Sequence, residues 1–153
     1  MFDQSKLTPG LEECLMLAYI EAKLERRKEL STEQVLLMLL ENTQVVTILN
    51  KFNINIRTLR AGLTNHINAN EPILDGDNEV NPEASTSMTR ICRHTLTLRF
   101  FKSAEKEPIS ESDFILSLVT DDTTVASQLL ATQGMDLDKL LYELVLGSDN
   151  KRF

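Results

Sequence analysis

The chain has 153 residues, of which 42% are hydrophobic and 25% charged, as expected for one globular domain with its own core. Its 16 Lys and Arg residues against 23 Asp and Glu residues give a formal net charge of −7, which argues against nucleic acid or an anionic membrane as partner. Cys14 and Cys92 are too few for a disulfide framework, and neither a signal peptide nor a membrane-spanning stretch is visible. We therefore expect a soluble domain, located in the cytoplasm.

Apolar residues at helical spacing predict four helices in the first half of the chain. Their approximate ranges are 8–27, 31–42, 43–51 and 55–67. The apolar stripe of the first predicted helix is Leu11, Cys14, Leu15, Ala18 and Ala22. The second begins with Ser31 in the S-x-x-Q form of a capping box. Because this helix is apolar on nearly every side, we expect it to be central and buried.

The second half of the chain repeats the pattern of the first. Between the halves, residues 71–84 hold five acidic residues, no basic residue and two prolines, which predicts a loop. The spacing of the first predicted helix recurs at Met88, Ile91, Cys92 and Thr95. The apolar run of the second recurs at 114–119, and the start of the fourth recurs at 135–140. The separation between matching positions grows slightly at each connection, as small loop insertions would produce.

This duplication predicts an all-α fold of about eight helices, arranged as two tandem four-helix repeats with pseudo-twofold symmetry. The repeats cover about 7–68 and about 86–147, within one domain over 1–153. Each central helix, about 31–42 and about 110–121, is too apolar to stand alone. We expect the two repeats to pack through these helices into one core.

The motifs of common catalytic and cofactor sites are absent from the sequence. No glycine is followed by lysine and no Gly-x-Gly pair occurs, which excludes a phosphate loop and a dinucleotide fingerprint. His66 and His94 lie far apart. Cys14 and Cys92 are expected to be small core residues. The alternative is a metal site at Cys92 and His94, but on a helix the side chains of these two residues would point to different faces. We expect no catalysis and no cofactor.

Two segments of the first half carry a resemblance to a known family. Residues 11–22, LEECLMLAYIEA, are similar to the opening helix of the N-terminal domain of Clp-family ATP-dependent unfoldases, particularly the ClpA branch. Residues 31–42, STEQVLLMLLEN, resemble the T-x-E-H-L-L-L-A-L-L-x-N block of that domain. With the order of the repeated helices, the likeness covers residues 7–148. It departs at Lys28–Leu30, where the family has His-Glu-Phe, and at Gln34, where it favours His.

The resemblance implies a protein-docking module and not an enzyme. In that family the domain lies on a tether at the entrance of a bacterial AAA+ ring. It receives unfolded or tagged substrates directly or through an adaptor such as ClpS, and the ring feeds them to the ClpP peptidase. The chain is then either a fragment of such an ATPase, with residues 147–153 as the start of the tether, or a free-standing relative.

The resemblance also implies a docking site at the junction of the first two helices. Glu33 matches the family there, whereas Lys28 replaces an acidic residue and follows Arg27. We expect Glu33 to be exposed in the first turn of its helix, where it either contacts an adaptor or only stabilises the helix start. The charge reversal at Lys28 would weaken contact with a basic adaptor.

A second candidate surface is apolar. Met16, Ile20 and Leu24 recur every four residues on the first predicted helix, beside its main apolar stripe. They either widen the buried face or form an exposed surface for unfolded or hydrophobic segments.

Two other functions fit parts of the sequence. One is a helical adaptor or regulator, unrelated to ATP-driven proteolysis, that binds a partner helix or peptide. The other is DNA binding through a basic stripe of Arg90, Arg93, Arg99 and Lys102, which the net charge of −7 disfavours.

Overall fold

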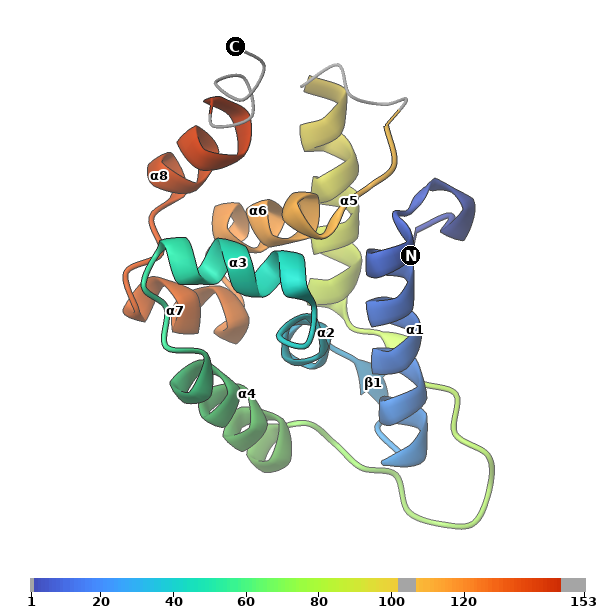
Figure 1. The fold of residues 1–153 in the computed structure, drawn as a ribbon. Coiled ribbons are helices and arrows are strands. Elements are labelled where there is room, and N and C mark those ends of the chain that lie inside the picture. Colours follow the sequence, from blue (N-terminus) through green and yellow to red (C-terminus); the bar gives the residue numbers. More distant parts are fainter. Residues whose placement is uncertain (1, 102–106, 147–153) are drawn as a thin grey trace.

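The computed structural model describes residues 2–101 and 107–146, and its architecture is all-α, as the periodicity predicts (Figure 1). The helices of the first repeat are α1 (Pro9–Leu24), α2 (Thr32–Leu39), α3 (Thr43–Lys51) and α4 (Ile56–Asn70). Those of the second are α5 (Thr86–Phe101), α6 (Glu111–Asp121), α7 (Val125–Thr132) and α8 (Leu137–Leu141). A 3-10 turn over Gln4–Lys6 precedes α1, and a π-helical turn over Tyr142–Leu146 follows α8. Among the described helices, none has the length and apolar character needed to cross a membrane.

The second helix of each repeat begins with a capping serine. The hydroxyl of Ser31 accepts a hydrogen bond from the amide of Gln34 at 3.1 Å, which confirms the predicted start of α2. The Gln34 side chain does not complete the box, because its amide donates to the carbonyl of Glu29 at 3.0 Å. In the second repeat, Ser110 and Asp113 form the complete reciprocal box.

The two repeats share one hydrophobic core. Its largest fully buried side chains include Leu36 of α2 and Phe114 of α6. Contacts of these two central helices run across the repeats in a symmetric way: α2 packs on α7, and α6 packs on α3. The two repeats are therefore joined by contacts between the central helix of each repeat and the third helix of the other, and also by packing of α4 on α7.

Short extended segments before the helices also cross between the repeats. The two-residue strands β1 (Glu29–Leu30) and β2 (Glu83–Ala84) pair in parallel. An equivalent bridge joins Leu7 to Ile109, with the amide of Ile109 donating to the carbonyl of Lys6 at 2.8 Å. The helical pattern does not predict these pairings, because they involve only residues that enter helices in an extended conformation.

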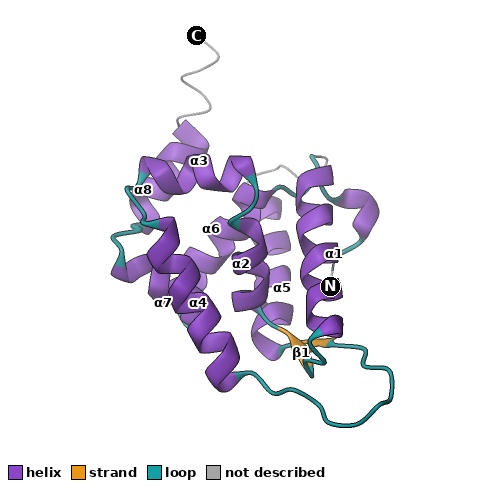
Figure 2. Ribbon diagram, turned by 60° about the horizontal axis from the view of Figure 1, so that its bottom comes forward, coloured by secondary structure: helices purple, strands orange, loops and turns teal. Residues whose placement is uncertain are grey.

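The acidic loop between the repeats is anchored to the end of α1, as Figure 2 shows at the lower edge of the fold. Arg26 donates from Nε to the carbonyl of Leu74 at 3.0 Å and from Nη1 to that of Asn78 at 2.8 Å. Lys23 pairs with Glu79 at 2.7 Å. These contacts hold the loop beside the junction where the resemblance places docking.

Candidate functional site

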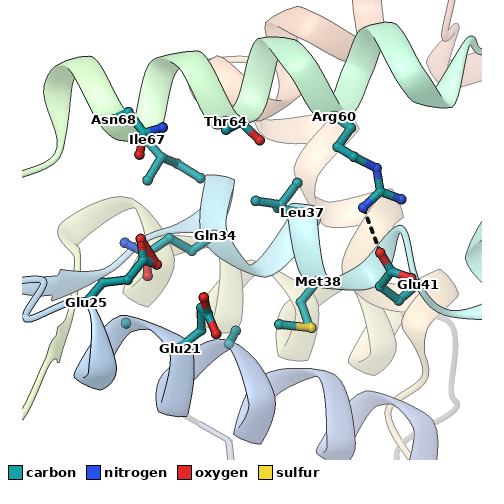
Figure 3. Close-up of a pocket in the computed structure, with 12 residues that line it drawn as sticks. Glu21, Glu25, Gln34, Leu37, Met38, Glu41, Arg60, Thr64, Ile67 and Asn68 are labelled. Carbon is teal, nitrogen blue, oxygen red and sulfur yellow. Dashed lines mark hydrogen bonds and ion pairs between the residues drawn. The ribbon is translucent and has the colours of Figure 1, made fainter.

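A groove of about 370 Å³ lies between α1, α2 and α4 (Figure 3). Its lining residues are Ala18, Glu21, Ala22, Glu25, Gln34, Leu37, Met38, Glu41, Arg60, Thr64, Ile67 and Asn68. Figure 3 shows α1 and α4 as opposite walls, with Leu37 and Met38 of α2 between them. The volume lies at the small end of the range for sites that take a ligand or a few side chains of a peptide.

The groove exists because one of its walls carries small side chains. Ala18 and Ala22 lie one turn apart on the buried face of α1, so their side chains leave space between α1 and α4. Leu37 and Met38 are only partly buried, and Ile67 closes the floor from α4. The result is an apolar floor open to solvent.

The rim of the groove is mainly acidic. Glu21 and Glu25 lie one turn apart along α1, and Glu41 lies beyond the end of α2. The lining cation Arg60 pairs with Glu41 at 2.6 Å, so it does not neutralise the two carboxylates on the opposite wall. Figure 3 shows this ion pair at one end and the two glutamates along the lower wall.

A polar cluster closes the other end of the groove. The buried guanidinium of Arg27 donates from Nη1 to the carbonyl of Glu71 at 2.9 Å and from Nη2 to the Glu25 carboxylate at 3.2 Å. The Glu71 carboxylate accepts from the Ser31 hydroxyl and from the Gln34 side chain. Burial raises the pKa of Glu71, and these hydrogen bonds oppose that rise.

Arg27, predicted as a docking residue, is only 2% exposed. Its Nη1 also contacts the carbonyl of Ile67 at 3.3 Å, so the side chain satisfies carbonyl groups at the end of α4. Lys28, the other cation of this junction, is exposed. Arg27 thus caps the end of α4, whereas its neighbour Lys28 lies on the surface.

The exposure predicted for Glu33 is wrong, since its side chain lies under α7 and the residue is 7% exposed. Its Oε2 accepts a hydrogen bond from the backbone amide of Ala126 at 2.9 Å and one from the Thr32 hydroxyl at 2.9 Å. Ala126 belongs to the first turn of α7, where a carboxylate is favoured by the free amides and the helix dipole. No local sequence signal links Glu33 to a helix of the other repeat. A direct contact between Glu33 and a partner protein stays a prediction.

The stripe of Met16, Ile20 and Leu24 is exposed, with Leu24 at 75%. Leu17 extends it, so four apolar side chains face solvent along α1. Of the two alternatives for this stripe, the structure supports an exposed apolar ridge.

The remaining candidate residues have structural surroundings. Burial raises the pKa of the Cys14 and Cys92 thiols to about 11, so neither is an activated nucleophile. Over residues 2–101 and 107–146, no cluster of three or more His, Cys, Asp or Glu side chains could hold a metal ion. In the proposed DNA stripe, Arg90 pairs with Asp121 and Arg99 is buried, while Lys102 lies outside the described residues.

Comparisons with known proteins agree with this fold. The N-domain of ClpV from Vibrio cholerae has 17% identity and a TM-score of 0.75, covering 94% of this chain and 85% of that one. The Hsp104 N-terminal domain from Candida albicans has 13% identity and a TM-score of 0.73, covering 91% of each chain. A complex of a ClpV N-domain with VipB peptide has 16% identity and a TM-score of 0.69, covering 94% and 89%. At these identities the likeness establishes the fold alone.

No curated protein matches the sequence. The model of the Clp repeat (R) N-terminal domain family, however, matches residues 6–133, which is most of the chain. The duplicated helices, the shared core and this match have one explanation: the chain belongs to the Clp repeat N-terminal domain family, whose domains are non-catalytic.

Proposed function

We propose that the chain is a docking domain that binds a peptide segment of a partner protein in the groove between α1, α2 and α4. The observation that carries this proposal is an apolar floor, formed by Leu37, Met38 and Ile67, that remains open to solvent. A side chain that fills such a space gains about 25 cal/mol of free energy for each Å² of apolar surface that it buries. The complex of a ClpV N-domain with VipB peptide supports peptide binding by this fold.

Family membership supports a wider role, which is part of the same proposal. The domain serves a Clp-type AAA+ unfoldase in the cytoplasm, either as part of the same chain or as a free-standing relative. Its partners are unfolded or tagged substrates and a ClpS-like adaptor, and the unfolded products pass to a ClpP-type peptidase. The ClpA-like opening helix and the Ser31–Asn42 block support this role.

The ridge of Met16, Leu17, Ile20 and Leu24 is a second contact surface for the same partners. It lies on the solvent side of α1, whereas the groove lies beside Ala18 and Ala22. Lys28 is the exposed charge of the nearby junction. Arg27 and Glu33 act in this arrangement by holding α4 and α7 in place.

The groove can be tested by filling it. Short peptides are selected from a random phage-displayed library on the whole chain, and their affinities for the Ala18→Leu variant are measured by fluorescence anisotropy. Because the added side chain occupies the groove, we expect binding to weaken at least about tenfold. The matched control is Ala61→Leu on the exposed part of α4, which should change affinity less than about twofold.

Thermal unfolding of both variants shows whether the fold is retained. If the selected peptides bind Ala18→Leu and Ala61→Leu equally well, then the groove is not the docking site.

A further inference from the structure

The charges of the groove indicate which peptides it accepts, an inference that rests on the docking function proposed above. Three carboxylates line the groove, and Arg60 is committed to one of them, Glu41, at 2.6 Å. Glu25 shares one oxygen with Arg27 at 3.2 Å. Glu21 is exposed, and its carboxylate makes no hydrogen bond or ion pair with the described residues. The wall formed by α1 therefore presents unneutralised negative charge beside the apolar floor.

The spacing of the two glutamates adds to this argument. Glu21 and Glu25 lie at positions i and i+4 along α1 and its C-cap, so their side chains are neighbours on one face of the helix. Two like charges at this spacing disfavour the isolated helix. A cation bound between them would reduce this repulsion and make an ionic contact with each carboxylate at the exposed rim of the groove.

One more unused group lies at the same end of the groove. Gln34 lines the groove, and its Nε2 donates to the Glu29 carbonyl and to the Glu71 carboxylate. Its Oε1 is buried and has no hydrogen-bond partner among the described residues. A buried acceptor without a partner is unfavourable, so a rearrangement of the Gln34 side chain that brings Oε1 to an N–H donor of a ligand would be favoured.

From these three observations we propose that the groove selects a peptide segment in which an apolar side chain is flanked by Lys or Arg. The apolar side chain packs on Leu37, Met38 and Ile67. The cation binds between Glu21 and Glu25, and a ligand N–H donates to Gln34. The net charge of −7 steers such a segment toward the domain.

Three short fluorescein-labelled model peptides of equal length separate these contributions. The first combines Leu and Lys in an amphipathic pattern, the second replaces every Lys by Glu, and the third replaces every Leu by Ser. Their binding to the whole chain is measured by fluorescence anisotropy at low and at physiological salt. We expect the Leu/Lys peptide to bind at least about tenfold more tightly than either of the others.

The variant that tests the site is the double substitution Glu21→Gln and Glu25→Gln. Its matched control is Glu29→Gln with Glu83→Gln, which removes the same charge at two exposed positions outside the groove. We expect the groove variant to bind the Leu/Lys peptide at least about tenfold more weakly and with a smaller salt dependence. The control should change affinity less than about threefold.

The inference is overturned if the Leu/Glu peptide binds as tightly as the Leu/Lys peptide, or if both double variants lose affinity equally. It is also overturned if the Ser/Lys peptide binds as tightly, since ionic attraction alone would then explain binding. In each case the Ala18→Leu variant separates this failure from that of the docking function. A Leu/Glu peptide that binds the wild type but not Ala18→Leu would leave peptide docking in the groove intact.

Discussion

The two repeats share a backbone pattern but differ at the face that forms the groove. Helices α1 and α5 each have 16 residues. When the two helices are aligned from their first residues, Ala18 corresponds to Thr95, and Ala22 corresponds to Arg99. The small side chains of the first repeat are thus replaced by larger polar ones in the second.

In the second repeat these larger side chains join α5 to α6. The hydroxyl of Thr95 donates to that of Ser117 at 2.7 Å, and Arg99 pairs with Asp113 at 3.1 Å. Ser117 occupies the position of Met38 when α2 and α6 are aligned from their capping serines. The duplicated fold therefore keeps one face open to solvent and closes the equivalent face with hydrogen bonds and an ion pair.

The strongest test of this comparison replaces Arg99 by the small residue of the first repeat. Arg99→Ala leaves the mostly buried Asp113 carboxylate without its ion pair, so we expect a loss of about 3 kcal/mol in the free energy of unfolding. Urea unfolding followed by circular dichroism measures it. Arg93→Ala, at an exposed position of the same helix, should cost less than about 0.5 kcal/mol. Equal losses in the two variants would contradict a structural role for the polar link.

A glutamate near the start of each central helix makes a hydrogen bond to the other repeat. Glu33 of α2 binds the start of α7, while Glu111 of α6 accepts from Asn42, the N-cap of α3, at 2.9 Å. Glu33→Ala leaves the Ala126 amide buried without an acceptor, so we expect a loss of about 2 kcal/mol in unfolding free energy. Chemical denaturation measures the loss against Glu29→Ala, an exposed control. A variant as stable as its control would show that water replaces this contact.

The smallest expected effect is a pH-dependent contribution to the free energy of unfolding from an ion pair of the second repeat. Arg90 and Asp121 form an ion pair at 2.7 Å, whereas the equivalent positions of the first repeat hold Glu13 and Asn42. The hydrogen bond from Arg90 lowers the pKa of Asp121 to about 2. Because the folded pKa lies below the unfolded value of 3.8, this stabilisation is present above pH 4 and is lost as pH falls toward 2.

Arg90→Gln should therefore lower stability by about 1 kcal/mol at pH 7, a figure that allows for the partial exposure of Arg90. The difference from wild type should shrink between pH 4 and pH 2. Guanidinium titrations at several pH values check this, with Arg93→Gln as control. A difference that stays constant down to pH 2 would assign the loss to packing and not to the ion pair.

The sequence by itself determined the helices, their duplication and the family. Apolar spacing predicts the buried stripe of α1, from Leu11 to Ala22, and Ser31 marks the start of α2. These signals are local, because a helix is defined by contacts between residues three or four apart and by the capping of its own ends. The same periodicity, which returns in the second half from Met88 onward, reveals the repeat.

Only the tertiary structure decided which side chains are available to a partner. Glu33 and Arg27 are polar residues beside a helix start, yet packing against α7 and the end of α4 buries both. Met16 and Leu24 are apolar, yet they remain exposed because no described helix covers that side of α1. The groove itself depends on α4, which lies across from two alanines of a helix much earlier in the chain. Exposure is set by contacts between distant segments, and no local pattern encodes those contacts.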